Sequence, residues 1–454
     1  MKGFARAFSG VLLVCMLCLL CLWRQESLPD LSGVAAKLQD SVGQINTLSD
    51  LIEGGIPGIT PSTPELTDPD APYVEGTPAP GVDTDFETAL VTAIVACEET
   101  VDVSAFALSA ADLKQQVSQV FFTHPELFYV NTAYRIGTPA GSTTVSQVQL
   151  EYLYEKDKIP AMIATYEAAV DEIVAGVDPA GSDFDKILYL HDYFIRHYSY
   201  DYVGLQNGNA IRDAYTFFTE KTGVCQAYML GLIAVCDEVG LECLPVTSTE
   251  MNHAWNLVKI DGEWYHIDVT WDDAGGETAA VYPSYVSYDY FLLSGEKLYN
   301  DGRKVAWSAT QSATATVYDN VVWREDAHLP LVKKGDSYYC IVYDGNPVIL
   351  SGTATEMTAM RELTGVYWTS SQGGMYMRSW SGFAAYGDAL VFNTSSALYF
   401  YQPETNMPTR IAELSASLGG LQIFGIVDVT DGVVTYVAAA DYQGEFELRT
   451  YTIA

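Results

Sequence analysis

A predicted β-hairpin around Asp261-Gly262 is the feature that most constrains what this chain can fold into. This dipeptide is typical of a two-residue turn, and strand-like apolar runs flank it at residues 253–260 and 263–271. A two-residue turn places Trp255 opposite Asp268. A slip of one residue would move one strand's apolar side chains to the wrong face, so the register is tightly specified.

The same register brings two ionisable side chains together. His253 and Asp268 become diagonal neighbours on one face, about 7–8 Å apart at the backbone, which long side chains can bridge. The opposite face of the hairpin is mostly apolar, and Asn256 interrupts this pattern. The other residues of that face suit a core: Ala254, Val258, Ile260, Tyr265, Ile267 and Val269.

Cys225 precedes the hairpin and opens an apolar run at residues 226–235. The turn at residues 221–224 before it, and Gly240 after the run, predict a helix that begins at the cysteine. A free thiol has a pKa of about 8.5, and a helix N-terminus and a nearby imidazolium both favour the thiolate. This setting is typical of a nucleophilic cysteine.

Cys225, His253 and Asp268 therefore form a candidate catalytic triad. The histidine would take and return the proton, and the aspartate would fix its tautomer and stabilise its charged form. The Cys225 backbone N–H is a natural oxyanion donor, because it lies at the start of the helix. The sequence does not identify the second donor, for which Tyr200 is the candidate.

Other residues near the triad have two interpretations. Trp255, Trp264 and Trp271 either pack in an aromatic core or wall the cleft and exclude water. We assign Trp255 and Trp271, with Gln226 and Tyr200, to the oxyanion and substrate cleft.

The remaining histidines and aspartates compete with this assignment. His266 lies on the same predicted face as His253, and we expect it to flank the site rather than act as its base. His191 and His197 are expected to satisfy local hydrogen bonds. Asp272-Asp273 could bind a cation, but a solvated loop edge is the preferred interpretation.

Five motifs lie within residues 180–295: Gly223–Tyr228, His253–Asn256, Asp268–Asp273, Leu190–Tyr193 and Tyr288–Leu293. Through them this segment resembles the transglutaminase-like superfamily, and bacterial members in particular. The resemblance implies a papain-like α+β fold, with a cysteine on a helix facing a histidine and an aspartate on a sheet. It does not fix the reaction, because the superfamily includes amide cross-linkers, peptidases, amidases and members that have lost activity.

Composition excludes several classes of partner. The 454-residue chain has 23 Lys and Arg against 58 Asp and Glu, a net charge of −35 and a pI near 4.2. Such a surface repels phosphate backbones, so we expect no nucleic-acid partner. The sequence has no EF-hand loop, and no C-x-x-C pair outside its N-terminal apolar segment, so we expect neither a metal site nor a cofactor.

The five cysteines beyond the N-terminal segment allow two interpretations. An odd number leaves one unpaired, which fits a nucleophile and up to two disulfides. The preferred interpretation is that the four cysteines other than Cys225 are buried free thiols: Cys97, Cys236, Cys243 and Cys340.

The N-terminal part predicts export. Residues 1–23 read as a signal peptide or membrane anchor, with Lys2 and Arg6 before an apolar stretch at 8–23. We favour an uncleaved anchor with the rest of the chain outside the cell, with a cleaved signal peptide as the alternative. Residues 24–84 end in a proline-rich stretch that predicts an extended stalk.

Three folded regions follow. Residues 85–180 predict an α+β N-terminal domain, with helices near 85–99, 113–121 and 159–174, a turn that leads into a strand at 124–130, and a strand at 148–154. Residues 181–300 form the predicted catalytic core, which a helix at 186–197 begins. Residues 305–454 are rich in Tyr, Val, Thr and Gly and predict an all-β domain.

A faint repeat marks the all-β region. Asp336, Asp388 and Asp431 each lie in a turn-like Gly/Asp context, 52 and 43 residues apart, near the length of a propeller blade. Three units are too few for an ordinary closed propeller, so a sandwich or a blade-like stack is equally expected. Aromatic runs at 376–380 and 399–401 could bind a glycan or peptide, but cross-strand packing is the preferred interpretation.

Two functions remain open from the sequence. The first is a surface-displayed thiol enzyme that acts on amide bonds through an acyl-enzyme, by transfer to an amine or by hydrolysis, on protein or cell-wall peptide substrates. The second is a catalytically weak scaffold whose β domain binds a surface polymer or protein.

Overall fold

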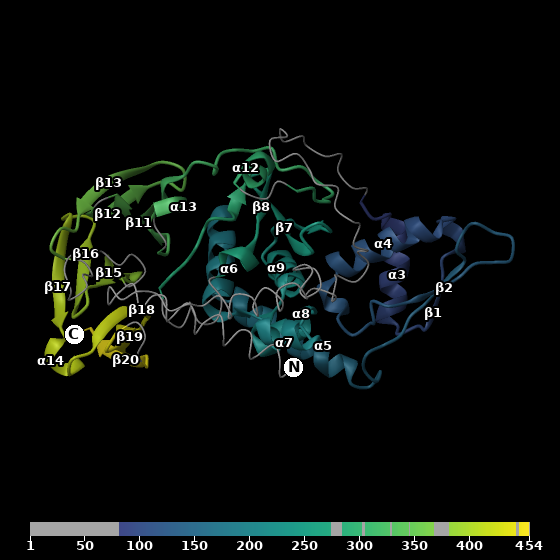
Figure 1. Ribbon diagram of the computed structural model, residues 1–454, viewed down its shortest axis with the longest axis horizontal. Helices are drawn as coiled ribbons and strands as arrows, with labels where there is room; N and C mark the ends of the chain where they lie inside the picture. The colour runs from purple at the N-terminus through teal and green to yellow at the C-terminus, as the bar shows by residue number, and fades with distance from the viewer. Residues whose placement is uncertain are drawn as a thin grey trace, which may run out of the picture. The chain divides into compact units, whose positions relative to one another are not determined.

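The computed structural model describes residues 81–273, 284–301, 305–326, 329–344, 346–366, 381–441 and 445–453 (Figure 1). The predicted apolar segment at 8–23 and nearly all of the predicted stalk lie outside these ranges, as does the aromatic run at 376–380. Within them, no helix has both the length and the apolar composition needed to cross a bilayer.

The N-terminal region of the described chain combines helices with a small antiparallel sheet of order β1-β3-β2. Its helix α4 begins after Ser109, whose hydroxyl accepts the N–H of Asp112 and so caps the first turn. Its elements are α3 (Thr84–Val95), β1 (Thr100–Asp102), η2 (Ser104–Phe106), α4 (Ala110–Thr123), η3 (Pro125–Leu127), β2 (Arg135–Gly137), β3 (Gln147–Gln149) and α5 (Ile159–Val174).

Two predicted strands of this region need correction. Pro125–Leu127 form a short 3₁₀ helix, because Pro125 lacks an N–H and its fixed φ suits a first helical turn, and the strand predicted to follow is reduced to an isolated bridge at Val130. The predicted strand at 148–154 is reduced to Gln147–Gln149 and an isolated bridge between Val130 and Tyr152.

The central region packs a buried helix against a four-stranded antiparallel sheet of order β6-β7-β8-β9. Helix α9 is buried from Cys225 to Cys236 and contacts β6 and β7. The elements are α6 (Asp183–His197), β4 (Ser199–Tyr200), α7 (Tyr202–Asn207), α8 (Ala214–Glu220), β5 (Thr222–Gly223), α9 (Cys225–Glu238), β6 (Cys243–Ser248), β7 (His253–Ile260), β8 (Glu263–Ile267), α10 (Val269–Asp272), β9 (Phe291–Leu293) and α12 (Gly295–Asn300).

The β7–β8 hairpin has the predicted register. Ile260 pairs with Glu263, and the turn residues Asp261 and Gly262 have φ values of 51° and 88°. Both faces of the hairpin are buried, since Trp255 and Leu257 join a second apolar cluster on the face opposite the main core. The face that carries His253 is therefore packed as well as the face that the sequence assigned to the core.

The second strand of the hairpin is shorter than predicted. The ladder ends where Asn256 pairs with Ile267, and Asp268 is the N-cap of the short helix α10. The reason is local hydrogen bonding: the Asp268 carboxylate accepts the N–H of Trp271, and the Asp268 N–H donates to the Tyr290 carbonyl.

In the described part of the C-terminal region, all elements are strands apart from two short helices, and the strands form three antiparallel sheets of consecutive strands. Their orders are β10-β11-β12-β13, β14-β15-β16-β17 and β18-β19-β20. The elements are α13 (Val322–Asp326), β10 (Val332–Lys334), β11 (Ser337–Asp344), β12 (Asn346–Gly352), β13 (Met357–Glu362), β14 (Phe383–Tyr386), β15 (Ala389–Asn393), β16 (Ala397–Gln402), β17 (Met407–Glu413), α14 (Ser415–Leu418), β18 (Gln422–Thr430), β19 (Val433–Ala439) and β20 (Glu447–Thr452).

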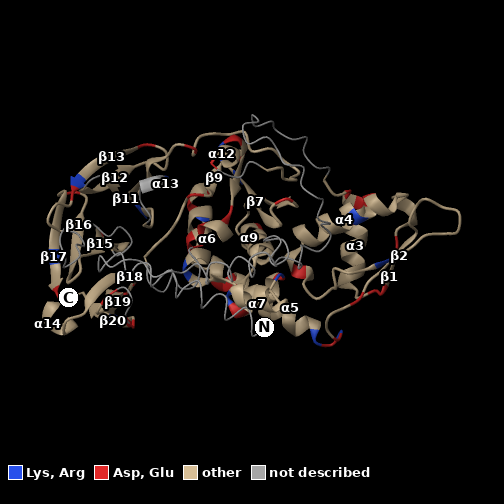
Figure 2. Cartoon of the chain, in the orientation of Figure 1, with Lys and Arg blue, Asp and Glu red and all other residues tan. Residues whose placement is uncertain are grey.

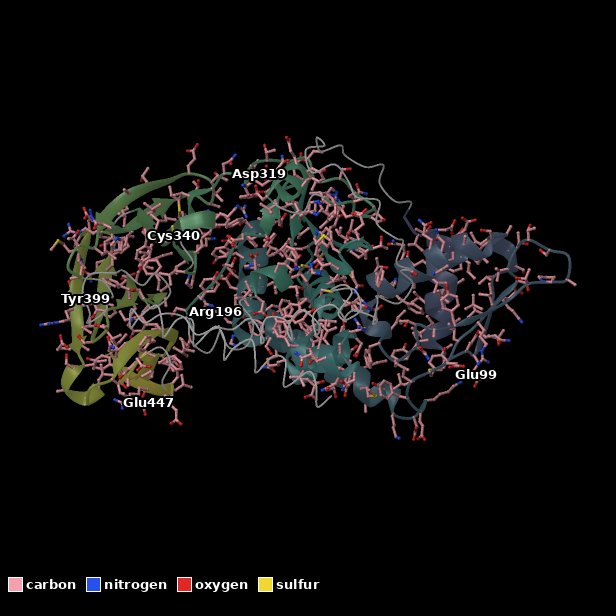
Figure 3. The ribbon with its side chains drawn as sticks, viewed as in Figure 1. Glu99, Arg196, Asp319, Cys340, Tyr399 and Glu447 are labelled. Carbon is pink, nitrogen blue, oxygen red and sulfur yellow. The ribbon has the colours of Figure 1, made fainter. Side chains whose placement is uncertain are left out.

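The sequence repeat has a structural counterpart in these sheets. In each of the three sheets, the turn between the first and second strands contains one of the repeated aspartates. These are Asp336 in the first sheet, Asp388 in the second and Asp431 in the third. Tyr399 on β16, marked in Figure 3, stacks on Phe392 of β15, with ring centroids 5.3 Å apart. This is the cross-strand packing that the sequence favoured for the aromatic run.

One apolar cluster links the regions. It contains buried side chains from α4 and α9, and also Cys340 and Val342 of β11 and Leu350 of β12. Cys340 is marked in Figure 3. The first C-terminal sheet therefore shares a core with the central region.

Candidate functional site

Cys225 is the first residue of α9, and the chain that leads to it is tightly packed. The preceding strand β5 pairs in parallel with β4, which sets Gly223 beside Tyr200. A Cβ at Gly223 would lie 2.6 Å from that of Ala227, so only glycine fits this approach. No side chain caps the helix, which leaves its first N–H groups to be satisfied by other acceptors.

His253 is the first residue of β7, and its imidazole links Cys225 to Asp268 through hydrogen bonds. Its Nε2 lies 2.6 Å from Asp268 Oδ2, and the same imidazole is hydrogen-bonded to the Cys225 thiol. Because Nε2 contacts Asp268, Nδ1 is the nitrogen that remains for the thiol. The structure thus brings together the three residues that the sequence singled out.

Asp268 has a separate contact for each carboxylate oxygen. Oδ2 contacts His253, whereas Oδ1 accepts the Trp271 N–H at 3.1 Å and caps α10. The residue is 2% exposed. Its orientation is therefore fixed by the helix that it begins.

The electrostatics of the three groups favour a charged thiolate–imidazolium pair. Burial raises the pKa of the Cys225 thiol, but the charge and hydrogen bond of His253 and the N–H of Ala254 together lower it below its ordinary value. Burial alone would lower the pKa of His253, but the charges of Asp268 and Cys225, with a hydrogen bond to each, raise it to about 9. Both shifts favour a proton on the His253 imidazole rather than on the Cys225 sulfur.

The Ala254 N–H is a contributor that sequence reasoning missed. It donates to the Cys225 sulfur from the strand that begins with His253. No side-chain pattern could have identified it, because a backbone donor has no residue-type signature.

Aromatic rings flank the His253 imidazole. Trp255 lies 5.5 Å away with nearly parallel planes, and Trp271 lies 5.4 Å away. Trp255 is 1% exposed, and its indole N–H donates to His266 Nδ1 at 3.1 Å, so it packs beneath the site rather than facing solvent. Trp271 is 44% exposed and forms the solvent-exposed side of the site beside His253.

The two other cleft candidates have different settings. Tyr200 lies near the nucleophile: burial, and then the charge of Cys225, raise the pKa of its hydroxyl. Gln226 is buried and lines a cavity of about 220 Å³ with Phe128 and Leu230, and its Oε1 has no hydrogen-bond partner among the described residues.

A buried network holds the segment that carries Asp268. His191 is fully buried and bonds to Asp192 through Nδ1 and to Asp272 through Nε2, both at 3.1 Å. Asp272 also accepts from the Ser287 hydroxyl and the Tyr290 N–H. The prediction of a solvated edge at Asp272 is therefore wrong, because this carboxylate is buried against His191. The sequence could not indicate this contact, since His191 lies 81 residues earlier.

The described ranges contain neither a disulfide bond nor a metal site. All five cysteines there are free thiols. No group of three His, Cys, Asp or Glu side chains in those ranges has the arrangement of a metal site.

Comparison with known proteins shows a family similarity in the segment that carries these three residues. A family model described as the transglutaminase-like superfamily matches residues 168–269. The kyphoscoliosis peptidase of Homo sapiens is 24% identical over 163 residues, which are 32% of this chain and 24% of that protein. Its Mus musculus counterpart is 24% identical over 164 residues, 32% of this chain and 25% of that protein.

The similarity covers only part of each protein. This chain spans about a quarter of the length of the curated relatives that it matches. A solved structure described as the crystal structure of a TGase is 14% identical, with a TM-score of 0.22, over 44% of this chain and 51% of that one. The similarity to the transglutaminase-like superfamily is confined to residues 168–269.

Proposed function

We propose that this protein is a thiol enzyme that acts on amide bonds outside the cell, with Cys225 as nucleophile, His253 as acid and base, and Asp268 as the group that orients the histidine. The observation that carries the proposal is the 2.6 Å contact between His253 Nε2 and Asp268 Oδ2 on an imidazole that also bonds the Cys225 thiol. The 24% identity to kyphoscoliosis peptidases supports a substrate with a peptide or carboxamide carbonyl.

The first half of the reaction forms an acyl-enzyme. The Cys225 thiolate attacks the carbonyl carbon, and the N–H groups at the start of α9 stabilise the oxyanion. The tetrahedral intermediate then collapses as the C–N bond breaks. His253 gives its proton to the departing nitrogen, which leaves as ammonia or an amine, and a thioester remains on Cys225.

The second half decides the product. His253, now neutral, takes a proton from the incoming nucleophile as that nucleophile attacks the thioester. A primary amine yields a new amide, and water yields a carboxylic acid. Both routes regenerate the thiol. The exposed Trp271 beside His253 stands where it would shield the thioester from water.

One incubation distinguishes transfer from hydrolysis. The full chain is mixed with a glutamine-containing protein and a fluorescent primary amine, and both incorporated label and released ammonia or fragments are measured. Label incorporation means transfer; ammonia or fragments without label mean hydrolysis.

The control is Cys225→Ala, which removes the nucleophile and leaves the packing of α9 nearly intact. Both products should vanish in this variant while its circular dichroism stays unchanged. Activity that persists in Cys225→Ala, or no turnover with any glutamine or peptide substrate, would contradict the proposal and favour a binding scaffold.

A further inference from the structure

A cavity of about 220 Å³ lies against the first two turns of α9, where the candidate nucleophile also lies. Gln226, which follows Cys225 directly, lines this cavity together with Leu230. The loop before α8 forms another wall, and the Val224 N–H ties that loop to the start of α9 by donating to the Ile211 carbonyl. Successive side chains of a helix point about 100° apart, so the cavity and the catalytic imidazole lie on different faces of α9.

The Gln226 amide provides independent evidence for a ligand. The residue is 5% exposed, and its Oε1 accepts no hydrogen bond within the described residues. A buried polar group is normally hydrogen-bonded, and one without a partner costs stability. The terminal torsion of a glutamine is broad, so the amide can turn its oxygen or its nitrogen toward the cavity. A group bound in the cavity would supply the missing partner.

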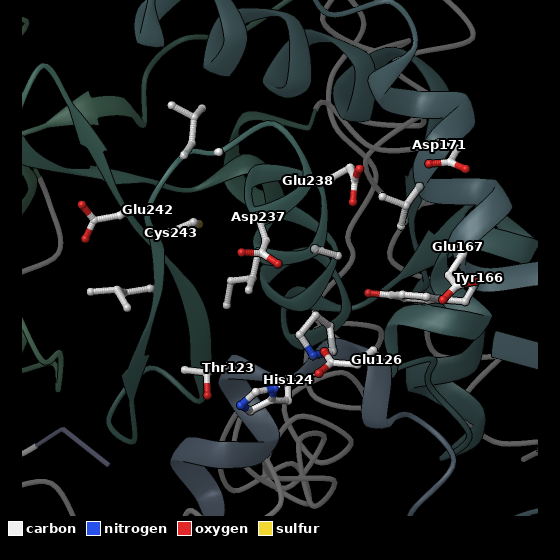
Figure 4. Close-up of a pocket in the computed structure, with 17 residues that line it drawn as sticks. Thr123, His124, Glu126, Tyr166, Glu167, Asp171, Asp237, Glu238, Glu242 and Cys243 are labelled. Atoms are coloured by element: carbon white, nitrogen blue, oxygen red, sulfur yellow. Dashed lines mark hydrogen bonds and ion pairs between the residues drawn. The ribbon is translucent and has the colours of Figure 1, made fainter. Parts of the chain in front are cut away.

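A larger cavity nearby lacks such a feature. It has a volume of about 870 Å³ and shares His124 and Pro125 with the smaller one (Figure 4). In the part of the chain that the structure describes, no buried side-chain atom without a partner lines it. The unpartnered oxygen therefore distinguishes the smaller cavity from the larger one.

The size and lining of the smaller cavity define what it can hold. Pockets for drug-sized ligands usually measure about 300–1,000 Å³, whereas a cavity of about 150 Å³ admits a benzene ring. A volume of about 220 Å³ therefore suits one aromatic side chain. Most of the wall is apolar, and it includes Phe121, Leu127, Phe128, Val130, Leu153 and Leu230.

The charged side chains of the lining already have partners. Asp213 caps α8, His124 lies between the carboxylates of two glutamates, and Arg212 is also engaged. Among the described residues that line the cavity, Gln226 Oε1 is the buried acceptor that remains for a ligand. An amide both donates and accepts hydrogen bonds, and so does a phenol hydroxyl, so the two groups can pair in either direction.

We propose that this cavity binds a tyrosine side chain of the substrate, close to the carbonyl that Cys225 attacks. The phenol ring packs on the apolar wall, and its hydroxyl is hydrogen-bonded to the Gln226 amide. The site belongs to the proposed function and rests on it, because it makes peptides with a tyrosine beside the attacked carbonyl the substrate class.

Alkylation of Cys225 in the full chain by iodoacetyl amino-acid amides tests this without turnover. The probes are iodoacetyl-tyrosinamide and the matched phenylalanine, glutamate and glycine compounds, and site-resolved mass spectrometry gives the rate at Cys225. The tyrosine probe should react about tenfold faster than the phenylalanine probe, because only its hydroxyl can pair with Gln226.

The tyrosine, phenylalanine and glycine probes are neutral for a reason. The chain has 58 Asp and Glu against 23 Lys and Arg, and Figure 2 shows how acidic side chains outnumber basic ones. Such a surface attracts cationic probes whatever the cavity binds, so a preference between two neutral probes reports on the cavity alone.

Two variants and a control locate the effect. Gln226→Leu should remove the preference for tyrosine over phenylalanine without lowering the melting temperature, because it removes an unpartnered buried amide. Ala210→Leu enlarges a half-buried loop residue that lines the cavity, and should slow both aromatic probes relative to the glycine probe. The control, Gln402→Leu, replaces an exposed glutamine of β16 and should keep the tyrosine preference within about twofold.

Several results would overturn this site. Equal rates for the tyrosine and phenylalanine probes, with fast alkylation of Cys225 by iodoacetamide, would mean that the cavity holds only water and would leave the proposed function standing. A tyrosine preference that survives in Gln226→Leu would assign the hydroxyl to another residue, and a fastest rate for the glutamate probe would replace the tyrosine with an acidic side chain. A Cys225 that reacts with every probe no faster than an ordinary thiol would contradict the proposed function, and this site with it.

Discussion

At the scale of single residues, Asp268 shows how one side chain can serve both fold and chemistry. One carboxylate oxygen caps α10 and the other contacts His253. The sequence predicted the second contact from the hairpin register, but not the first. Capping by an aspartate three residues before its partner N–H is a common pattern, yet the apolar run through Trp271 made a continued strand the simpler prediction.

Asp268→Asn should separate the two roles. The amide oxygen can still cap α10, so the melting temperature should change little, but the amide cannot stabilise the imidazolium or hold its tautomer. We expect kcat/KM to fall by about 10³–10⁴-fold. Asp289→Asn, which neutralises an exposed carboxylate nearby, serves as the control. Near-full activity in Asp268→Asn would show that the assigned role is wrong.

The pH dependence of activity follows from His253. Burial opposes its charge, but Asp268 and Cys225 raise its pKa to about 9, above its ordinary value. The protonated imidazole therefore contributes stability that is complete below about pH 6.5 and is lost as pH rises through about 9. Turnover measured against pH should fall on the alkaline side near pH 9, and in Asp268→Asn this limb should move to lower pH.

At the scale of elements, the short helix α10 connects the fold to the site. It carries Asp268 at its start and Asp272 at its end, and the Asp272 carboxylate is bound by His191 of α6. This tether could not be predicted, because its partners come from segments 81 positions apart and each alone resembles an ordinary surface residue. The hairpin could be predicted, because its turn and its apolar pattern are local in sequence.

Asp272→Ala should destabilise the protein strongly. Removing one partner of a buried ion pair leaves His191 without its Nε2 contact, and we expect a loss of about 3–5 kcal/mol in the free energy of unfolding. Urea denaturation measures this, with the exposed Asp289→Ala as the comparison. A loss no greater than in Asp289→Ala would mean that the buried pair does not hold α10.

At the scale of the whole described chain, the central region shares its core with the first C-terminal sheet. Trp323 of α13 is fully buried among Phe184, Tyr288 and Phe291, and its indole N–H donates to the Ala354 carbonyl at 2.7 Å. The all-β character and the repeat of three hairpin turns could be predicted from composition and spacing. The packing of the first C-terminal sheet against the central region could not be predicted, because contacts between distant segments leave no periodic pattern in the sequence.

Trp323→Ala should therefore destabilise the protein, although Trp323 lies outside the residues 168–269 that the family model matches. We expect a loss of about 3–5 kcal/mol in the free energy of unfolding, with the central and C-terminal regions unfolding together. Val322→Ala changes the neighbouring residue, which is 39% exposed, and should cost less than about 0.5 kcal/mol. Equal effects in the two variants would contradict a shared core.

The rate of Cys225 alkylation by iodoacetamide as a function of pH tests most directly whether His253 holds Cys225 as a thiolate. Site-resolved mass spectrometry separates Cys225 from the other four described thiols. The proposed thiolate–imidazolium pair predicts fast alkylation at pH 6, because His253 lowers the pKa of Cys225, and a shift of the whole profile to higher pH in His253→Ala. A Cys225 that reacts no faster at pH 6 than an ordinary thiol, or a profile unchanged in His253→Ala, would contradict it.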